Sequence, residues 1–196
     1  FVGQKNIVKN VEIMVESSKL RNVAADHMLL SGPPGLGKTS LAHLIAKEIG
    51  STLHVISGPA IEKKGDLAAI LTNIQPKDVL FIDEIHRMHI SIEEILYSAM
   101  EDYRLDLVIG QGPSARTMQI DISPFTLIGA TTRSGLLSRP LRDRFLASFH
   151  YDFYTDEELS LIVKENTKKL KLEMSSGAAA QISKCSRGTP RISNRI

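Results

Sequence analysis

The sequence predicts an α/β protein with a central parallel sheet flanked by helices, an inserted β-hairpin and a small all-helical lid domain. Short apolar runs are each typical of a strand buried inside such a sheet, and they lie at residues 28–30, 53–56, 79–82 and 125–130. Helical patterns separate most of these runs, and this alternation favours a parallel sheet. A fifth strand is expected near 147–153. Only helical patterns follow, so we expect an α/β domain over 1–153 and a helical domain over 154–196.

Apolar residues at spacings of three and four predict the helices. We expect them at 4–20, 41–49, 66–75, 92–100, within 136–145, after Thr155, at 175–186 and from Gly188 onward. Gly50 is a C-terminal stop signal for the second of these. Two segments, Ser91–Glu94 and Thr155–Glu158, have the form of capping boxes and predict where two helices begin.

Residues 105–122 depart from this alternation. Apolar and polar residues alternate on both sides of the turn sequence Gly110-Gln111-Gly112-Pro113. Period-two alternation around a glycine- and proline-containing turn is typical of a β-hairpin.

The composition is that of an ordinary globular chain. Its 196 residues are 42% hydrophobic and 23% charged, and the net charge is +2. The charge neither demands nor excludes nucleic acid. No apolar run approaches the ~18 residues of a membrane span. The lone Cys185 rules out an internal disulfide and is expected to be a packing residue in a cytoplasmic protein. The chain begins at Phe1, so we expect an excised part of a longer protein.

The strongest chemical signal is Gly32-Pro33-Pro34-Gly35-Leu36-Gly37-Lys38-Thr39, between an apolar run and a helical pattern. In this context the glycines let backbone N–H groups form a concave site for phosphate oxygens, at the positive end of the following helix. Lys38 supplies a charge for the β/γ-phosphates, and the Thr39 hydroxyl supplies a ligand for Mg²⁺. The alternative, an ordinary glycine-rich turn, does not explain the flanking strand and helix.

Polar residues follow two other predicted strands. Asp83 and Glu84 end the run 79–82, and Thr131 and Thr132 end the run 125–130. Ligand chemistry in parallel sheets gathers at these carboxyl ends. Asp83 is suited to hold Mg²⁺ and Glu84 to orient or deprotonate a water, which favours hydrolysis. A threonine hydroxyl can bond to that water or to the γ-phosphate, although threonine at a strand end is also common without function.

Two arginines and two histidines complete the candidates. Arg144 or Arg191 can stabilise charge on a γ-phosphate, although each taken alone also fits a surface arginine. His86 and His89 lack further metal ligands and are expected to be packing or surface residues. The segment Asp83-Glu84-Ile85-His86 also matches a two-lobed helicase motif, but those helicases need a second motor domain.

Five segments together carry a resemblance. They are Gly-Pro-Pro-Gly-Leu-Gly-Lys-Thr at 32–39, Phe-Ile-Asp-Glu-Ile-His at 81–86, Gly-Ala-Thr-Thr-Arg-Ser-Gly at 129–135, Pro-Leu-Arg-Asp-Arg-Phe at 140–145 and Arg-Gly-Thr-Pro-Arg-Ile at 187–192. In this combination the chain resembles the P-loop AAA+ ATPases, and more narrowly the RuvB family of bacterial Holliday-junction branch-migration motors. The hairpin segment Ile-Gly-Gln-Gly-Pro-Ser-Ala-Arg at 109–116 is the most specific marker.

The resemblance implies a role for each matching residue. Asp83 and Glu84 correspond to the Walker B acids, Thr132 to sensor 1, Arg144 to an arginine finger acting on a neighbouring subunit, and Arg191 to sensor 2. The implied catalytic set is Lys38, Asp83, Glu84, Thr132, Arg144 and Arg191. The implied ATP- or ADP-binding set is Val2, Gly35, Leu36, Gly37, Lys38, Thr39, Ser40, Glu101, Asp102, Tyr103, Arg144, Tyr154, Pro190 and Arg191. The implied Mg²⁺ ligands are Thr39 and Asp83.

The resemblance also implies partners. It implies a homo-hexameric ring around duplex DNA at Holliday junctions, the junction-binding protein RuvA docked on the hairpin through Leu107 and Ile109, and the resolvase RuvC as an indirect partner. The loop with Lys63 and Lys64 would face the DNA. The family's segment before Phe1 and its winged-helix domain after the lid are expected to be absent. Two alternatives stay open: a clamp-loader subunit and a nucleotide-dependent adaptor that does not hydrolyse ATP.

Overall fold

The computed structural model describes residues 1–109, 116–175 and 177–196. Its central element is a five-stranded sheet in the order β2-β3-β6-β1-β7, in which every neighbouring pair is parallel. The strands are β1 (Met28–Ser31), β2 (Leu53–Ser57), β3 (Val79–Asp83), β6 (Thr126–Thr131) and β7 (Ala147–His150). The predicted parallel sheet is therefore confirmed, with each strand within a few residues of its expected place.

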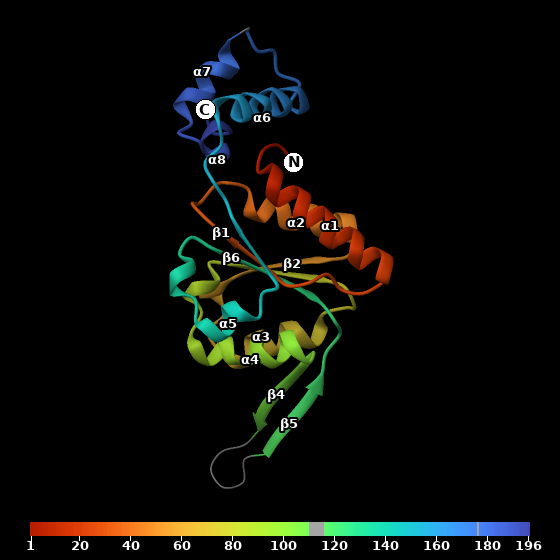
Figure 1. Cartoon of the computed structure of the whole chain (residues 1–196). Helices are drawn as coiled ribbons and strands as arrows, with labels where there is room; N and C mark the ends of the chain where they lie inside the picture. Colours follow the sequence, from red (N-terminus) through yellow and green to blue (C-terminus); the bar gives the residue numbers. More distant parts are fainter. Residues whose placement is uncertain (110–115, 176) are drawn as a thin grey trace.

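Helices cover both faces of the sheet (Figure 1). One face carries α1 (Lys5–Arg21) and α2 (Lys38–Ile49), and the other carries α3 (Lys64–Asn73), α4 (Ile90–Glu101) and α5 (Arg139–Asp143). Side chains of β3 point alternately to the two faces of the sheet. Val79 and Phe81 pack in the core under α1 and α2, and Leu80 and Ile82 pack in the core under α3 and α4. Burying each such side chain stabilises the fold by about 1.5–3 kcal/mol, which explains the continuous apolar strand sequences.

The carboxyl ends of the strands lie at one edge of the sheet. Backbone register pairs Ser31 with Thr131, and Ile82 with Gly129, so β1, β3 and β6 end side by side. Short segments continue from this edge as η1 (Gly58–Ala60), η2 (Ile85–Arg87) and η4 (Ser134–Leu136). The predicted chemical residues at the ends of β1, β3 and β6 are thereby brought together.

The C-terminal part is a small helical lid beyond the same end of the sheet (Figure 1). It contains α6 (Asp156–Lys169), α7 (Ala178–Cys185) and α8 (Pro190–Ser193). The predicted capping box at Thr155 is present, because its hydroxyl accepts from the amide of Glu158 while the Glu158 carboxylate accepts from the amide of Thr155. The lid meets the extended segment that leads into it from β7 where the Tyr154 amide donates to the carbonyl of Gly188 at 3.0 Å.

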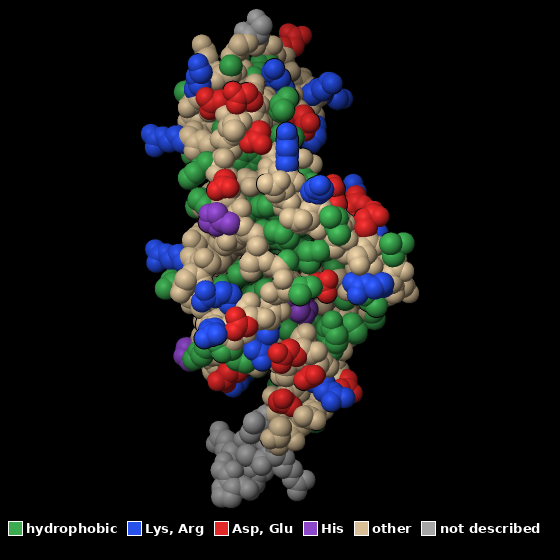
Figure 2. Space-filling model, in the orientation of Figure 1, with side chains coloured by type: hydrophobic (Ala, Val, Ile, Leu, Met, Phe, Trp, Pro, Cys, Tyr) green, Lys and Arg blue, Asp and Glu red, His purple; other side chains and the backbone are tan. Residues whose placement is uncertain are grey.

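The hairpin projects from the opposite end of the α/β domain (Figure 1). Its strands are β4 (Arg104–Ile109) and β5 (Arg116–Asp121), which pair antiparallel, so the predicted hairpin is confirmed. The predicted turn at residues 110–113 lies outside the described residues. Charged side chains of both signs are interspersed over the face in Figure 2, in keeping with the small net charge.

Two local predictions are wrong. Helix α4 begins at Ile90 with His89 as its N-cap, because the His89 Nδ1 atom accepts from the Ser91 amide at 3.3 Å. Ser91 therefore lies in the first turn and does not cap the helix. Cys185 is exposed at the end of α7, so it is not a packing residue. Within the described ranges, no helix is long and apolar enough to cross a membrane.

Candidate functional site

The phosphate-binding loop connects β1 to α2 through three glycines with positive φ. Gly37 is the N-cap of α2 at φ 97°, where a side chain would be strained. The cap supplies no side-chain acceptor, so the first N–H groups of α2 stay available to an anion. Gly32 has φ 133°, and a Cβ atom there would lie 2.7 Å from the carbonyl oxygen of Tyr151 on the β7 side. Glycine is thus required both for the turn and for close packing against the sheet.

Lys38 begins α2 and is buried. Its Nζ atom donates to the carbonyl oxygens of Gly32 at 2.8 Å and Pro33 at 2.7 Å, so the ammonium group folds back over the loop. Burial lowers the pKa of Lys38, and the nearby carboxylates of Asp83 and Glu84 oppose that shift. An incoming phosphate would give this buried cation a better partner than two neutral carbonyl groups.

The two acids lie at the end of β3: Asp83 is its last residue and Glu84 follows it. The Asp83 carboxylate accepts from the Glu84 amide at 3.0 Å, and Glu84 itself is left-handed, with φ 50°. Such a conformation is strained for a residue with a side chain and needs support. Gly58 in η1 provides close packing, because a Cβ atom there would lie 2.6 Å from the Glu84 carbonyl oxygen. The backbone of Glu84 is therefore held by the segment that follows β2.

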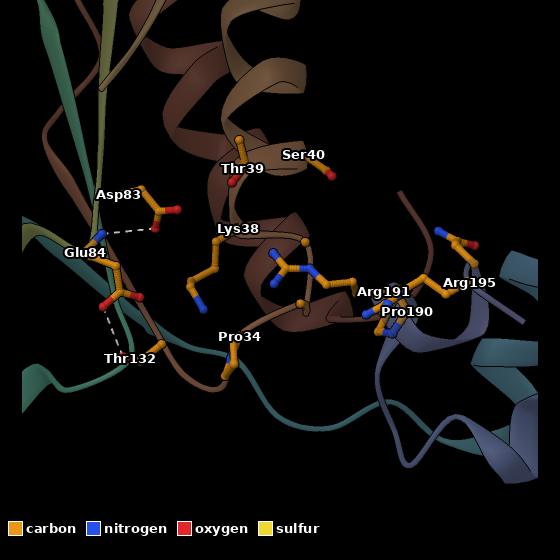
Figure 3. A pocket seen from close by; sticks show the side chains of 13 residues that line it. Pro34, Lys38, Thr39, Ser40, Asp83, Glu84, Thr132, Pro190, Arg191 and Arg195 are labelled. Carbon is orange, nitrogen blue, oxygen red and sulfur yellow. Dashed lines mark hydrogen bonds between the residues drawn. The ribbon is translucent and has the colours of Figure 1, made fainter. Parts of the chain in front are cut away.

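The Glu84 carboxylate is contacted by Thr132, the residue after strand β6, and by His86 in η2. The Thr132 hydroxyl donates to its Oε2 atom at 3.2 Å, and the His86 Nε2 atom lies 3.3 Å from the same oxygen (Figure 3 shows the Thr132 contact). The His86 Nδ1 atom lies 2.8 Å from the Thr131 hydroxyl. His86 thus belongs to the site, which sequence reasoning missed. Only the β3–β6 pairing brings residues 86 and 131 together.

The lid closes one side of this site. The Arg191 amide donates to the Gly35 carbonyl at 3.3 Å, and a Cβ atom at Gly35 would lie 2.9 Å from the Arg191 Cβ atom. Between lid and sheet is a cavity of about 480 Å³ into which groups from both domains point (Figure 3). It is lined by Pro34, Gly35, Gly37, Lys38, Thr39, Ser40, Asp83, Glu84, Thr132, Pro190, Arg191, Asn194 and Arg195.

This cavity unites most of the predicted residues and adds two from the lid. Asn194 and Arg195 were not anticipated from the sequence. They follow Arg191 by three and four positions, the spacing that places residues on one side of a helical turn. That spacing from Arg191 was the sequence signal by which the two residues could have been found. The geometry provides a cationic loop, two carboxylates and a further cation around one volume, which suits a polyphosphate and a metal ion.

Comparison with protein families matches residues 1–151 to the Holliday junction DNA helicase RuvB P-loop domain and residues 154–196 to the RuvB AAA lid domain. The chain belongs to the RuvB family. The RuvB subunits of Kosmotoga olearia and Thermosipho melanesiensis, each described as a Holliday junction branch migration complex subunit, are 56% and 57% identical over 196 residues. The alignments cover 100% of this chain but 57% and 63% of those relatives, so the chain spans about three-fifths of their length.

Solved structures give the same family. The structure titled Thermotoga maritima RuvB Holliday junction branch migration motor is 52% identical, with a TM-score of 0.89, and the match covers 100% of this chain and 60% of that one. A mutant of the same Thermotoga protein reaches a TM-score of 0.91 at 51% identity, covering 61% of its chain. The RuvB-type P-loop and lid arrangement is therefore the fold of this chain.

Three predicted nucleotide-binding residues of this RuvB-family chain do not line the cavity: Val2, Leu36 and Tyr154. Leu36 is buried, and its carbonyl accepts from the Tyr154 hydroxyl at 3.0 Å. Burial, with a contribution from Glu158, raises the pKa of Tyr154 to about 12, so this hydroxyl remains a donor at neutral pH. Tyr154 therefore ties the entrance of the lid to the back of the phosphate loop.

A second group lies away from the cavity: Glu101, Asp102, Tyr103 and Arg144. Arg144 donates to the Glu101 carboxylate at 3.1 Å and to the Pro140 carbonyl at 2.8 Å. Its guanidinium lies 4.5 Å from the centre of the Tyr97 ring. Arg144 is thus ordered on the α4–α5 surface and does not reach the cavity of its own chain.

The hairpin of the RuvB-family chain carries the predicted partner residues. Leu107 is half-buried and packs against the core cluster below the hairpin, so part of its surface is unavailable to a partner. The residue opposite it, Met118, is 43% exposed. Ile109 ends β4, and its side chain lies outside the description. Of the two lysines predicted to lie on a DNA-facing loop, Lys63 is the N-cap of α3 and Lys64 its first residue, where Lys64 pairs with Glu94 at 3.3 Å in an exposed position.

Proposed function

We propose that this chain is the ATP-hydrolysing core of a motor subunit that drives branch migration of Holliday junctions in recombination and DNA repair. The observation that carries the proposal is the single cavity between sheet and lid, which collects Lys38 and Thr39, the acids Asp83 and Glu84, and Arg191. The RuvB-family membership of the whole chain supports the choice of DNA as the substrate that is moved.

In the proposed site, the N-terminal amides of α2 and the loop backbone bind the β- and γ-phosphates of ATP. Lys38 leaves the Gly32 and Pro33 carbonyls and bonds to the phosphates. The Thr39 hydroxyl and the Asp83 carboxylate are oxygen donors of the kind that Mg²⁺ prefers, and the bound ion would neutralise phosphate charge. Arg191 extends from the lid toward the γ-phosphate.

Glu84 is proposed to be the base for the attacking water. Its Oε2 atom is occupied by Thr132 and His86, whereas none of the described residues hydrogen-bonds to Oε1. Oε1 therefore accepts a proton from water as the water oxygen attacks the γ-phosphorus and the bond to the β,γ-bridging oxygen breaks. The products are ADP and inorganic phosphate.

The motor is proposed to act as a homo-hexameric ring. Each Arg144 would reach the nucleotide of the neighbouring subunit, together with Glu101, Asp102 and Tyr103 of the same surface. The separation of Arg144 from its own cavity supports this trans arrangement. Head-to-tail contacts between identical subunits close naturally into rings.

Further proposed partners are duplex DNA inside the ring, RuvA on the β4–β5 hairpin through Leu107 and Ile109, and RuvC indirectly, in the cytoplasm. Hydrolysis would change the contact between Arg191 and the phosphate loop, and so move the lid against the sheet domain. The lid is joined to the sheet domain through residues 151–154. We propose that its rotation about this connection is the movement that displaces bound DNA.

A synthetic four-way DNA junction tests the proposal. The protein, incubated with RuvA, ATP and Mg²⁺, should convert the junction into its duplex products, and Lys38→Ala should not. Junction conversion that persists without ATP, or in Lys38→Ala, would contradict the proposal. The control is Lys19→Ala, which changes an exposed lysine on α1 paired with Glu48 and should leave conversion unchanged.

A further inference from the structure

A chain of close polar contacts connects the end of strand β6 to the carboxylate of Glu84 through His86. The Arg133 amide donates to the Thr131 hydroxyl oxygen at 2.9 Å, and that hydroxyl lies 2.8 Å from the His86 Nδ1 atom. The His86 Nε2 atom lies 3.3 Å from Glu84 Oε2. The His86 side chain is 6% exposed, so little water competes for these contacts.

The direction of these bonds follows from donor and acceptor capacity. Thr131 is fully buried, and its oxygen already accepts from the Arg133 amide. Its hydroxyl hydrogen needs an acceptor, and among the described residues the one within reach is the His86 Nδ1 atom. Nδ1 therefore accepts, and Nε2 carries the ring hydrogen at 3.3 Å from Glu84 Oε2.

We infer that His86 is a positioning residue for Glu84, held in its donating tautomer by Thr131. The carboxyl end of β6 then holds the Glu84 carboxylate through two arms, one direct from Thr132, the residue after the strand, and one through Thr131 and His86. Both arms end on Oε2. The carboxylate plane is thereby fixed with Oε1 directed to the water.

This role is distinct from packing. A histidine that is buried only to fill space needs no carboxylate beside it. A glutamate carboxylate held by a single donor can still rotate about the bond that joins it to the side chain. Glu84 has a left-handed backbone, so its side chain starts from an unusual direction and has few local restraints. The Thr132 hydroxyl bonded to Oε2 and the His86 Nε2 atom packed 3.3 Å from the same oxygen supply the restraint. The inference rests on the proposed role of Glu84 in ATP hydrolysis.

The experiment compares His86→Ala with the unmodified chain in DNA-stimulated phosphate release and in equilibrium binding of a fluorescent ATP analogue. We expect kcat to fall about ten- to a hundred-fold, the scale expected for a misplaced reacting group, while the nucleotide Kd changes less than about twofold. Thr131→Val should reproduce part of the fall in kcat, because Nδ1 loses its donor. Thr131→Ser keeps the hydroxyl and should retain the parent kcat.

Two further variants separate positioning from stability. His27→Ala removes another buried histidine that also bonds to β6, through the Leu127 amide at 2.9 Å, but lies away from the cavity. It should lower the unfolding midpoint without lowering kcat. In a Glu84→Gln background, His86→Ala should cause no further loss of turnover, because the two residues act as one unit.

The outcomes distinguish this inference from the proposed function. If the unmodified protein releases no phosphate from ATP, the proposed function fails and the inference fails with it. If the unmodified protein hydrolyses ATP and His86→Ala has the parent kcat, the inference alone is overturned. A parallel loss of nucleotide binding and turnover would also overturn it. Should His86→Ala not fold, the Thr131→Val and Thr131→Ser pair decides by the same criteria.

Discussion

Mixing two inactive variants tests whether Arg144 completes a site on another subunit. In Arg144→Ala the acids of the cavity stay intact, and in Glu84→Gln the guanidinium on the α4–α5 surface stays intact. Because Arg144 is bonded to Glu101 and does not line its own cavity, one variant's site can be completed by the other variant's arginine. Arg144→Ala alone should lose about 10³-fold or more in kcat, and Glu84→Gln alone about 10²-fold or more.

The expected recovery can be calculated. In rings assembled at random from equal amounts, an active interface needs an Arg144→Ala subunit beside a Glu84→Gln subunit in the correct order. Two independent choices of one half give about one quarter of the interfaces, and so about one quarter of the parent activity if the sites act independently. The assay is steady-state phosphate release after the subunits are mixed and exchanged.

A mixture that stays as inactive as its separate components would refute the trans arrangement. Arg139→Ala is the matched control, because Arg139 begins the short helix that Arg144 caps, its side chain is 89% exposed, and it pairs with Asp143 across one turn. That variant should keep the parent activity. Its mixture with Glu84→Gln should therefore show no recovery beyond its own contribution.

The remaining predictions concern affinity and stability. Arg191→Ala should weaken binding of an ATP analogue by about ten-fold or more in a fluorescence titration, since a charge-assisted contact contributes roughly 1.5–3 kcal/mol; unchanged affinity would contradict the role of the lid. Phe125→Ala should lower the free energy of unfolding by about 3–5 kcal/mol in urea, because the ring is fully buried. Burial alone would raise the pKa of Asp78, but hydrogen bonds from His54 and two backbone amides outweigh it and lower that pKa. The stability that this carboxylate contributes is present above its unfolded pKa and is lost as pH falls through the folded value, so Asp78→Asn should flatten the loss of stability measured below about pH 4. Burial raises the pKa of Glu93, so its ionisation opposes folding as pH rises above about 4.5, and Glu93→Gln should raise the unfolding midpoint at pH 7 more than at pH 4.

Much of the architecture could be predicted from local patterns. The run Val79–Ile82 has apolar side chains toward both faces, and a parallel sheet is the structure that buries both. Glycine spacing before Lys38 was sufficient to place the phosphate loop at a strand end and a helix start. The two acids and the pair Thr131 and Thr132 were predicted because chemistry in such sheets gathers at the carboxyl ends of strands, and the family resemblance singled out Thr132.

What could not be predicted depends on contacts between distant segments. His86 acquires its role from strand order, since β3 and β6 are neighbours although β4 and β5 lie between them in the chain. The N-cap of α4 is His89 and not the predicted Ser91. The His89 imidazole nitrogen accepts a hydrogen bond from the backbone amide of Ser91, whereas the Ser91–Glu94 pattern had assigned the capping role to the Ser91 hydroxyl. Asn194 and Arg195 reach the cavity because α8 docks against the phosphate loop.

Glu84→Gln provides the most direct test of the central claim, that the cavity between sheet and lid binds ATP and hydrolyses it with Glu84 as base. The measurement is single-turnover hydrolysis of labelled ATP, with the bound nucleotide quantified in the same samples. Glu84→Gln should retain the parent affinity for ATP and lose turnover by about 10²-fold or more, whereas Lys38→Ala should lose binding. Turnover by Glu84→Gln at the parent rate would contradict the account.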